Sequence, residues 1–186
     1  KEPEHAVAIV RAVRRAVSIP LTVKMRSGFD ADSRNAPELA YRCQEEGAET
    51  ITIHWRTRED RYGGIRSIDK IAETKQRLSI PVIANGDIVD IESAEKMYRD
   101  TGCDGIMVGR GTLKNPWLLQ ELRCHFLGLP WTPPSAEEKH QLLFDFLDHY
   151  YERFQHQTAT LGKFKQIAKY FCESLNDARN FRATLL

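Results

Sequence analysis

Polar side chains stand at the ends of four short apolar runs, and their types suit a phosphorylated ligand. The four groups are Lys24 with Arg26, His54 with Arg56, Asn85-Gly86-Asp87, and Gly109-Arg110-Gly111. A guanidinium binds phosphate in bidentate fashion, and glycine lets backbone N–H groups approach it. A lysine that closes an apolar run is costly to desolvate unless an anion meets it. These residues therefore predict an anion-binding site.

Each of these groups also has an ordinary structural interpretation. Lys24 could close its run with a salt bridge, and His54 could be a satisfied core histidine. Asn, Gly and Asp are common turn formers, so residues 85–87 could be a simple turn. Gly-Arg-Gly alone is weak support for a phosphate site. It gains weight because it follows a buried run and precedes Asn115-Pro116, which predicts a helix start.

The four apolar runs predict strands of a parallel sheet. They cover residues 20–25, 50–54, 81–85 and 105–109. They are β-branched and nearly continuous, as in strands buried on both faces. Helices are predicted between them over residues 37–46, 68–78 and 91–100. Gly47 follows the helix over residues 37–46, and the helix over residues 91–100 has Asp90 in position to cap its start and Gly102 after its end. Strand–helix alternation predicts right-handed βαβ units.

A faint internal repeat favours a barrel over an open sheet. Ser-Ile-Pro enters the first and third strands, and a Gly-x-acid tripeptide precedes the second and fourth. A (β/α)₈ barrel takes ~250 residues. This sequence of 186 residues offers only four strands. We therefore expect an α/β fold that is the second half of a TIM-type barrel. The first half would be missing from this chain or supplied by a second chain.

An all-α domain is expected after the barrel half. Residues 128–135 are rich in turn formers, and they predict a linker. Apolar stripes at helical spacing then follow, and they predict core-facing helices. The stripes are formed by Leu142, Leu143, Phe146, Leu147 and Tyr150, and by Phe164, Ile167, Ala168 and Phe171. The expected domains are residues 1–125 and 126–186.

Composition excludes several other classes of protein. The net charge is +1. A membrane helix needs an apolar run of ~18 residues or more, which no segment of this sequence approaches. Cys43, Cys103, Cys124 and Cys172 are scattered, so neither a metal site nor a disulfide framework is expected. Reduced thiols and the absence of a signal peptide predict a cytoplasmic location.

In a barrel the strand ends form the active-site mouth. A lysine near the ring of a phosphorylated cofactor there would stabilise negative charge on the ring, which suits a flavin.

Five sequence motifs resemble those of the bacterial tRNA-dihydrouridine synthases. Residues 23–28 resemble V-K-x-R-x-G, and residues 52–58 resemble T-x-H-G-R-T-R. Residues 80–88 and 104–111 resemble two further signature strands, and Asn115-Pro116-Trp117 follows as in the family. The motifs come in family order and spacing over about residues 1–125, and the remainder resembles the family's RNA-binding helical domain.

The resemblance implies an enzyme that uses FMN, reduced by NADPH, to convert uridine in tRNA to 5,6-dihydrouridine. By motif match, Lys24 would lie against the flavin ring and His54 beside it. Asn85, Gly86 and Asp87 would line the phosphoribityl path, and Gly109 and Arg110 would hold the phosphate. Contacts to RNA phosphates are expected from five basic residues: Arg56, Arg58, Lys163, Lys165 and Lys169.

Three departures from the family pattern modify these expectations. The family's catalytic cysteine stands in N-x-G-C-P, which no cysteine of this chain matches, so no catalytic residue is assigned. The chain is expected to be a fragment with little or no synthase activity by itself. Trp55 replaces a usual glycine, and it could crowd the cofactor or repack the loop. Leu186 comes before the point where the helical domain normally ends.

Two other functions remain open from the sequence. The first is a non-catalytic RNA-binding module derived from this family, which would bind tRNA without flavin. The second is another FMN barrel oxidoreductase that acts on a small molecule, which would bind flavin without salt-dependent affinity for tRNA. The helical region counts against the second, since such an enzyme has no evident need of it.

Overall fold

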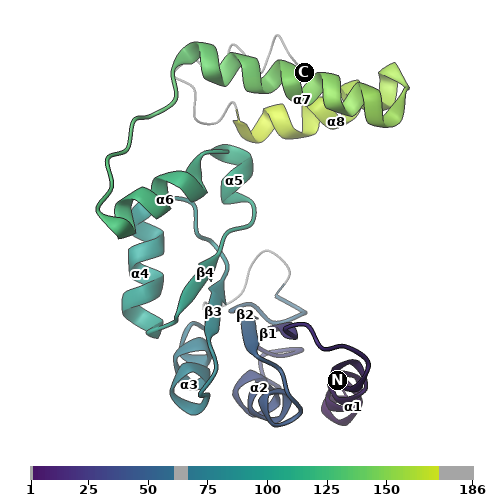
Figure 1. Cartoon of the computed structure of the whole chain (residues 1–186), viewed down its shortest axis with the longest axis vertical. Helices are drawn as coiled ribbons and strands as arrows, with labels where there is room; N and C mark the ends of the chain where they lie inside the picture. Colours follow the sequence, from purple (N-terminus) through teal and green to yellow (C-terminus); the bar gives the residue numbers. More distant parts are fainter. Residues whose placement is uncertain (1, 61–66, 172–186) are drawn as a thin grey trace. The chain divides into compact units, whose positions relative to one another are not determined.

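The computed structural model describes residues 2–60 and 67–171. The chain divides into two compact units (Figure 1). One contains Lys1–Ile88 with Glu92–Gly109, and the other contains Val89–Ile91 with Arg110–Leu186. The division comes earlier than the boundary expected at residue 125, because the helices after Arg110 group with the C-terminal helices.

The first unit is a four-stranded parallel sheet with helices between its strands. The strands are β1 Thr22–Arg26, β2 Thr50–His54, β3 Val82–Asn85 and β4 Gly105–Met107, in the spatial order β1-β2-β3-β4. The helices are α1 Pro3–Ala16, α2 Ala36–Glu45, α3 Asp69–Arg77 and α4 Ile91–Thr101. The strands thus lie side by side in the order in which they follow one another along the chain, as successive βα units do in a barrel. The expected half-barrel with four βα units is confirmed.

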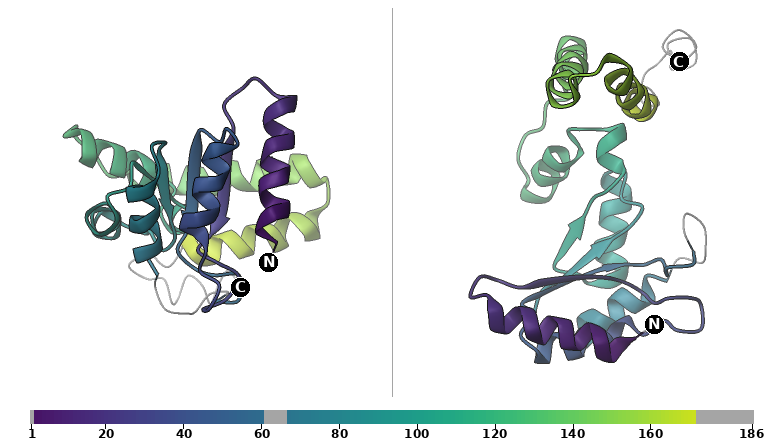
Figure 2. Two further views of the ribbon diagram at one scale, coloured as in Figure 1. Left: turned by 90° about the horizontal axis from the view of Figure 1, so that it is seen from below. Right: turned by 90° about the vertical axis from the view of Figure 1, so that its right-hand side faces the viewer.

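The core of this unit lies between one face of the sheet and the helices. Ile51, Ile53, Val82 and Ala84 are fully buried, as are Ala40 of α2 and Ile71 of α3. Helices α1, α2 and α3 lie on one side of the strands (Figure 2). The prediction of strands buried on both faces is wrong for β1. Thr22, Lys24 and Arg26 of β1 are exposed in alternation, because side chains along a strand alternate between its two faces and this face of β1 is open to solvent.

The ends of the predicted helices are close to those observed. Gly47 follows α2 with φ +91°, and Gly102 follows α4 with φ +64°. Both glycines thus have the positive φ that commonly ends a helix. Helix α3 is one residue shorter than predicted at each end. Strand β2 has the predicted bounds, whereas β4 ends at Met107, two residues early.

The second unit contains α5 Gly111–Lys114, α6 Leu118–Leu127, α7 Ala136–Phe154 and α8 Gln157–Phe171. Helix α6 begins at Leu118, two residues later than the helix start predicted at Asn115-Pro116. Asn115 instead forms a turn, in which its Oδ1 accepts the Trp117 N–H at 3.1 Å. The expected linker connects α6 to α7. One apolar groove, formed with α5, is lined by five residues of the predicted stripes on α7 and α8: Leu142, Leu143, Phe146, Ile167 and Phe171.

Among the described residues, no helix combines the length and apolar character needed to cross a bilayer.

Candidate functional site

Strand register brings the predicted residues at the strand ends onto one face of the sheet. Arg26 is aligned with His54, and His54 with Asn85. Aligned residues of a parallel sheet point to the same side. Side chains along one strand alternate between its two faces, so Lys24 and Arg26, two positions apart, share a face. We call this surface, with Lys24, Arg26, His54 and Asn85, the polar face. Three of the seven predicted cofactor residues therefore share one surface.

Two cations on β1 make this face attractive to an anion. Among the described residues, no carboxylate forms an ion pair with Lys24 or Arg26. Arg26 Nη1 donates to the carbonyl of Thr57 at 2.7 Å, which holds the guanidinium at the strand end. Partial burial, and then the charge of Arg26, lower the pKa of Lys24. The salt bridge considered for Lys24 is thus not found in the described part of the chain.

His54 is held as a neutral imidazole with a defined tautomer. Its Nδ1 accepts the backbone N–H of Arg56 at 3.1 Å, so the proton of the neutral ring is on Nε2. Burial, followed by the charges of Arg26, Lys24 and Arg56, lowers the pKa of His54 from 6.5 to about 4. The side chain is only half-buried. At neutral pH it therefore presents an Nε2–H donor to a ligand on the polar face.

Arg56 ties the end of β2 to the turn after β3. Its Nη1 and Nη2 donate to the two carboxylate oxygens of Asp87 at 3.1 and 2.6 Å. Only 8% of the Arg56 side chain is exposed, and its guanidinium stacks 4.1 Å from the centroid of the Trp55 ring. The Arg56 guanidinium is thus engaged in an internal pair in this structure, and its contact with RNA phosphates stays a prediction.

Trp55 repacks the loop and does not project from the sheet. It is 3% exposed, and a Cβ added to Gly86 would lie 2.5 Å from its indole ring. Gly86 has φ +120°, a conformation that also favours glycine. Asp87 follows with a φ of 51°, which an aspartate tolerates better than most residues. Residues 55–56 and 86–87 thus pack against one another and fix the backbone after the end of β2.

Asn85 and Gly109 come from neighbouring strands. Asn85 is buried, and its Nδ2 donates to the Met107 carbonyl at 2.8 Å, which links β3 to β4. Gly109 follows β4, and a Cβ there would meet nothing within 4 Å. Arg110 belongs to the second unit, where it begins the segment Arg110–Leu186, and it stands just before α5. A shared phosphate contact by Gly109 and Arg110 stays a prediction.

The remaining predicted RNA contacts lie elsewhere. Arg58 is exposed in the loop after β2, and its backbone N–H donates to the Gly28 carbonyl at 3.0 Å. On α8 of the second unit, Lys163 and Lys169 are exposed and Lys165 is half-buried. Arg26 was not among the residues predicted to bind the cofactor. The sequence had grouped it with Lys24 at the end of the first strand, and the alternation along β1 was the signal that could have added it to the cofactor residues.

Comparison with known proteins identifies relatives over the whole chain. The family model described as dihydrouridine synthase matches residues 1–186. A probable tRNA-dihydrouridine synthase of Rhodobacter capsulatus is 39% identical over 82% of this chain and 46% of its own length. Probable tRNA-dihydrouridine synthase 1 of Synechocystis sp. is 38% identical over 100% of this chain and 52% of its own length.

A third relative is tRNA-dihydrouridine synthase B of Xanthomonas campestris pv. campestris, which is 41% identical over 73% of this chain and 41% of its own length. The chain spans about half the length of these curated relatives. A solved mandelate oxidase variant with benzoyl-formic acid aligns with a TM-score of 0.45 and 18% identity, over 66% of this chain and 49% of that one, a likeness too distant to carry a conclusion. With a family match along its entire length, the chain belongs to the dihydrouridine synthase family.

Proposed function

We propose that this chain is part of a flavin-dependent tRNA-dihydrouridine synthase and that its polar face binds FMN. One observation carries the assignment of the cofactor: Lys24, Arg26 and His54 lie on one sheet face, where the two cations have no carboxylate partner among the described residues. Desolvating such cations is costly without an anion, and FMN is anionic at its phosphate and, when reduced, at its ring. The residues present therefore fit the cofactor.

Each residue of the polar face has a distinct part in this proposal. Lys24 lies against the cofactor and stabilises negative charge on it. His54 donates from Nε2, because Nδ1 is engaged by the Arg56 N–H. Asn85 and Gly86 line the cofactor from β3, and Asp87 fixes that turn through Arg56. Gly109 and Arg110 bind the phosphate.

When bound and reduced by NADPH, FMN would supply the hydride for the reduction of uridine in tRNA to 5,6-dihydrouridine, and the proton would come from a donor other than the residues assigned in this chain. The relatives named above are tRNA-dihydrouridine synthases, and this supports tRNA as the substrate. Arg58, Lys163, Lys165 and Lys169 are the proposed contacts to RNA phosphates, which makes the affinity for tRNA dependent on salt.

Flavin titration with charge variants tests the proposal. FMN binding is followed by the change in flavin absorption and fluorescence in this chain and in Lys24→Met. Loss of one charged contact is expected to weaken FMN binding by about tenfold or more. Lys96→Met is the matched control, since Lys96 is on α4 and pairs with Asp100, away from the polar face. Equal weakening by both variants, or by neither, would contradict the proposal.

Titration with tRNA separates the two other functions. Salt-dependent binding of tRNA with no binding of FMN would favour the RNA-binding module, and Arg110→Gln would then have no effect. FMN binding without salt-dependent tRNA affinity would favour the small-molecule oxidoreductase.

A further inference from the structure

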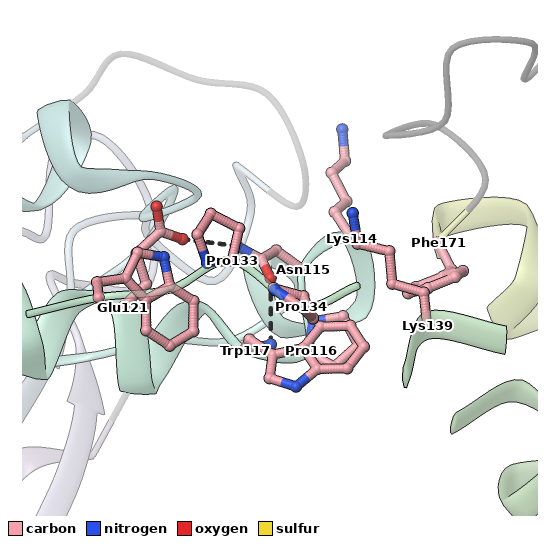
Figure 3. Close-up of a pocket in the computed structure, with 10 residues that line it drawn as sticks. Lys114, Asn115, Pro116, Trp117, Glu121, Pro133, Pro134, Lys139 and Phe171 are labelled. Carbon is pink, nitrogen blue, oxygen red and sulfur yellow. Dashed lines mark hydrogen bonds between the residues drawn. The ribbon is translucent and has the colours of Figure 1, made fainter. Parts of the chain in front are cut away.

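A pocket of about 240 Å³ in the second unit combines aromatic walls with basic side chains (Figure 3). It is built from the turn between α5 and α6, the segment before α7, the start of α7 and the end of α8. We call it the tryptophan pocket. Its lining residues include Lys114, Asn115, Trp117, Glu121, Trp131, Lys139 and Phe171, together with prolines 116, 133 and 134.

Aromatic rings from three separate segments line the pocket. Trp117 and Phe171 are neighbours, with ring centroids 6.4 Å apart and planes inclined by 48°. Trp131 lines the same pocket beside Pro133 and Pro134, whose fixed φ angles limit the motion of that segment. Both tryptophans are half-buried, so part of each indole is accessible to a ligand. Indole and phenyl faces stack on any nucleobase, whatever its sequence.

Two lysines add positive charge at the pocket. The Lys114 and Lys139 side chains extend toward the same side of the view in Figure 3. Lys139 is half-buried, and within the described ranges no carboxylate forms an ion pair with it. Two lysines against one glutamate leave the lining with a net positive charge, which favours an anionic ligand such as a phosphodiester.

A fixed pair of polar side chains completes the lining. Asn115 accepts the Trp117 N–H through Oδ1 at 3.1 Å and donates from Nδ2 to Glu121 Oε2 at 2.8 Å (Figure 3). This network orients the Glu121 carboxylate, which keeps further lone pairs for accepting hydrogen bonds. Carboxylates accept from exocyclic amino groups of bases such as cytosine. The pocket thus offers stacking surfaces, cations for a phosphate and an acceptor for a base edge.

We propose that the tryptophan pocket binds one unpaired nucleotide of an RNA. Its base stacks against the indoles of Trp117 and Trp131, and its phosphate pairs with Lys114 and Lys139. This inference rests on the proposed RNA substrate and adds a binding site that is separate from the polar face. A peptide ligand is less well matched. The aromatic walls suit a base and the two lysines suit a phosphate, and a nucleotide has both.

Quenching of intrinsic tryptophan fluorescence tests the pocket directly. The probes are cytidine monophosphate and a single-stranded RNA trinucleotide, added to the whole chain. Two of the three tryptophans of the chain line the pocket, so saturable quenching is expected, with Trp55 as a constant background. Loss of one stacked base costs about tenfold in affinity, so Trp131→Ala is expected to bind about tenfold more weakly and Trp131→Phe to retain most of the binding.

Lysine variants make the test independent of any change in folding. Lys139→Gln alters a surface charge and is expected to weaken trinucleotide binding severalfold and to reduce its salt dependence. Arg153→Gln on α7 is the matched control, since the exposed Arg153 does not line this pocket and has no proposed contact to RNA. Absence of saturable quenching, equal effects of Lys139→Gln and Arg153→Gln, or saturation by a proline-rich peptide in place of RNA would each overturn the inference.

The two proposals fail in different ways. If the chain binds tRNA and the Trp131 and Lys139 variants bind it equally well, the pocket inference is wrong and the proposed function stands. If neither FMN nor tRNA binds, the proposed function fails. The argument for RNA in the pocket then fails as well, whether or not cytidine monophosphate binds.

Discussion

Arg56 and Asp87 form a bidentate ion pair, at 3.1 and 2.6 Å, that joins the loop after β2 to the turn after β3. Each residue stands two positions after the end of its strand, β2 for Arg56 and β3 for Asp87. The pair also sits against Trp55, whose ring lies 4.1 Å from the guanidinium carbon. His54 precedes this cluster, and its imidazole accepts the N–H of Arg56. The ion pair therefore holds the backbone that orients His54.

Asp87→Asn is expected to destabilise the fold by about 2 kcal/mol, because it removes the carboxylate charge that pairs with the buried Arg56 guanidinium. The substitution keeps the shape of the side chain and a residue type that tolerates positive φ. Urea unfolding followed by circular dichroism measures the change. Glu38→Gln is the control, because it breaks a well-exposed pair with Arg77. Loss of such an exposed pair should cost about 0.5 kcal/mol or less. Equal costs would show that the Arg56–Asp87 pair adds no special stability.

Gly86→Ala is expected to cost about 3 kcal/mol, through overpacking and backbone strain together. The new Cβ would lie 2.5 Å from the Trp55 ring, and φ +120° is strained for alanine. Gly102→Ala separates the two effects, since Gly102 has φ +64° and nothing within 4 Å of its Cβ. Backbone strain alone should cost about 1 kcal/mol there.

The same substitution in a Trp55→Ala background gives a second check. The cost of Gly86→Ala should fall toward that of Gly102→Ala once the indole is removed. An unchanged cost would mean that the backbone conformation alone, and not contact with Trp55, requires glycine at position 86.

Stability is expected to fall as the pH drops from 6.5 toward 4, in part because of His54. Its folded pKa of about 4 lies below the ordinary 6.5, so the unfolded chain takes up the proton first and the folded state loses stability across this window. The contribution is at most about 3 kcal/mol, and solvent screening of the half-buried ring reduces it further. Above pH 6.5 both states are neutral at His54 and the effect vanishes. Urea unfolding at several pH values measures it, and His54→Gln should flatten the dependence.

Nuclear magnetic resonance of the His54 ring gives an independent measurement. The ¹⁵N shifts should identify the Nε2–H tautomer at neutral pH, and the ring should titrate near pH 4. A titration near pH 6.5 would contradict the burial and the cationic surroundings described here.

Ser135→Ala is expected to cost about 1 kcal/mol in the second unit. Ser135 Oγ accepts the Glu138 N–H at 3.1 Å, and the Ser135 N–H donates to Glu138 Oε2 at 2.7 Å. These two bonds close a capping box at the start of α7. Thermal unfolding followed by helical ellipticity measures the loss. Ser135→Asp retains a capping oxygen and should restore most of the stability; failure to do so would mean that the cap is not the cause.

The sequence by itself determined the strand–helix alternation and the positions of the strand ends. Short β-branched runs and helix-ending glycines such as Gly47 are local signals, so they required no knowledge of distant contacts. Repeated βα units predicted the half-barrel, and the strand-end rule brought Lys24, His54 and Asn85 into one candidate site. The motifs at these ends also identified the family.

Only the tertiary structure decided what the neighbours of each residue are. The buried pairing of Arg56 with Asp87 joins residues 31 positions apart, and no local signal separates such an internal pair from a surface arginine available to RNA. Trp55 could have crowded the site or packed inward, and its burial against Gly86 was decided by the turn after β3. The tryptophan pocket likewise brings Trp117, Trp131 and Phe171 together from distant segments, and such a meeting depends on chain packing that short-range patterns do not encode.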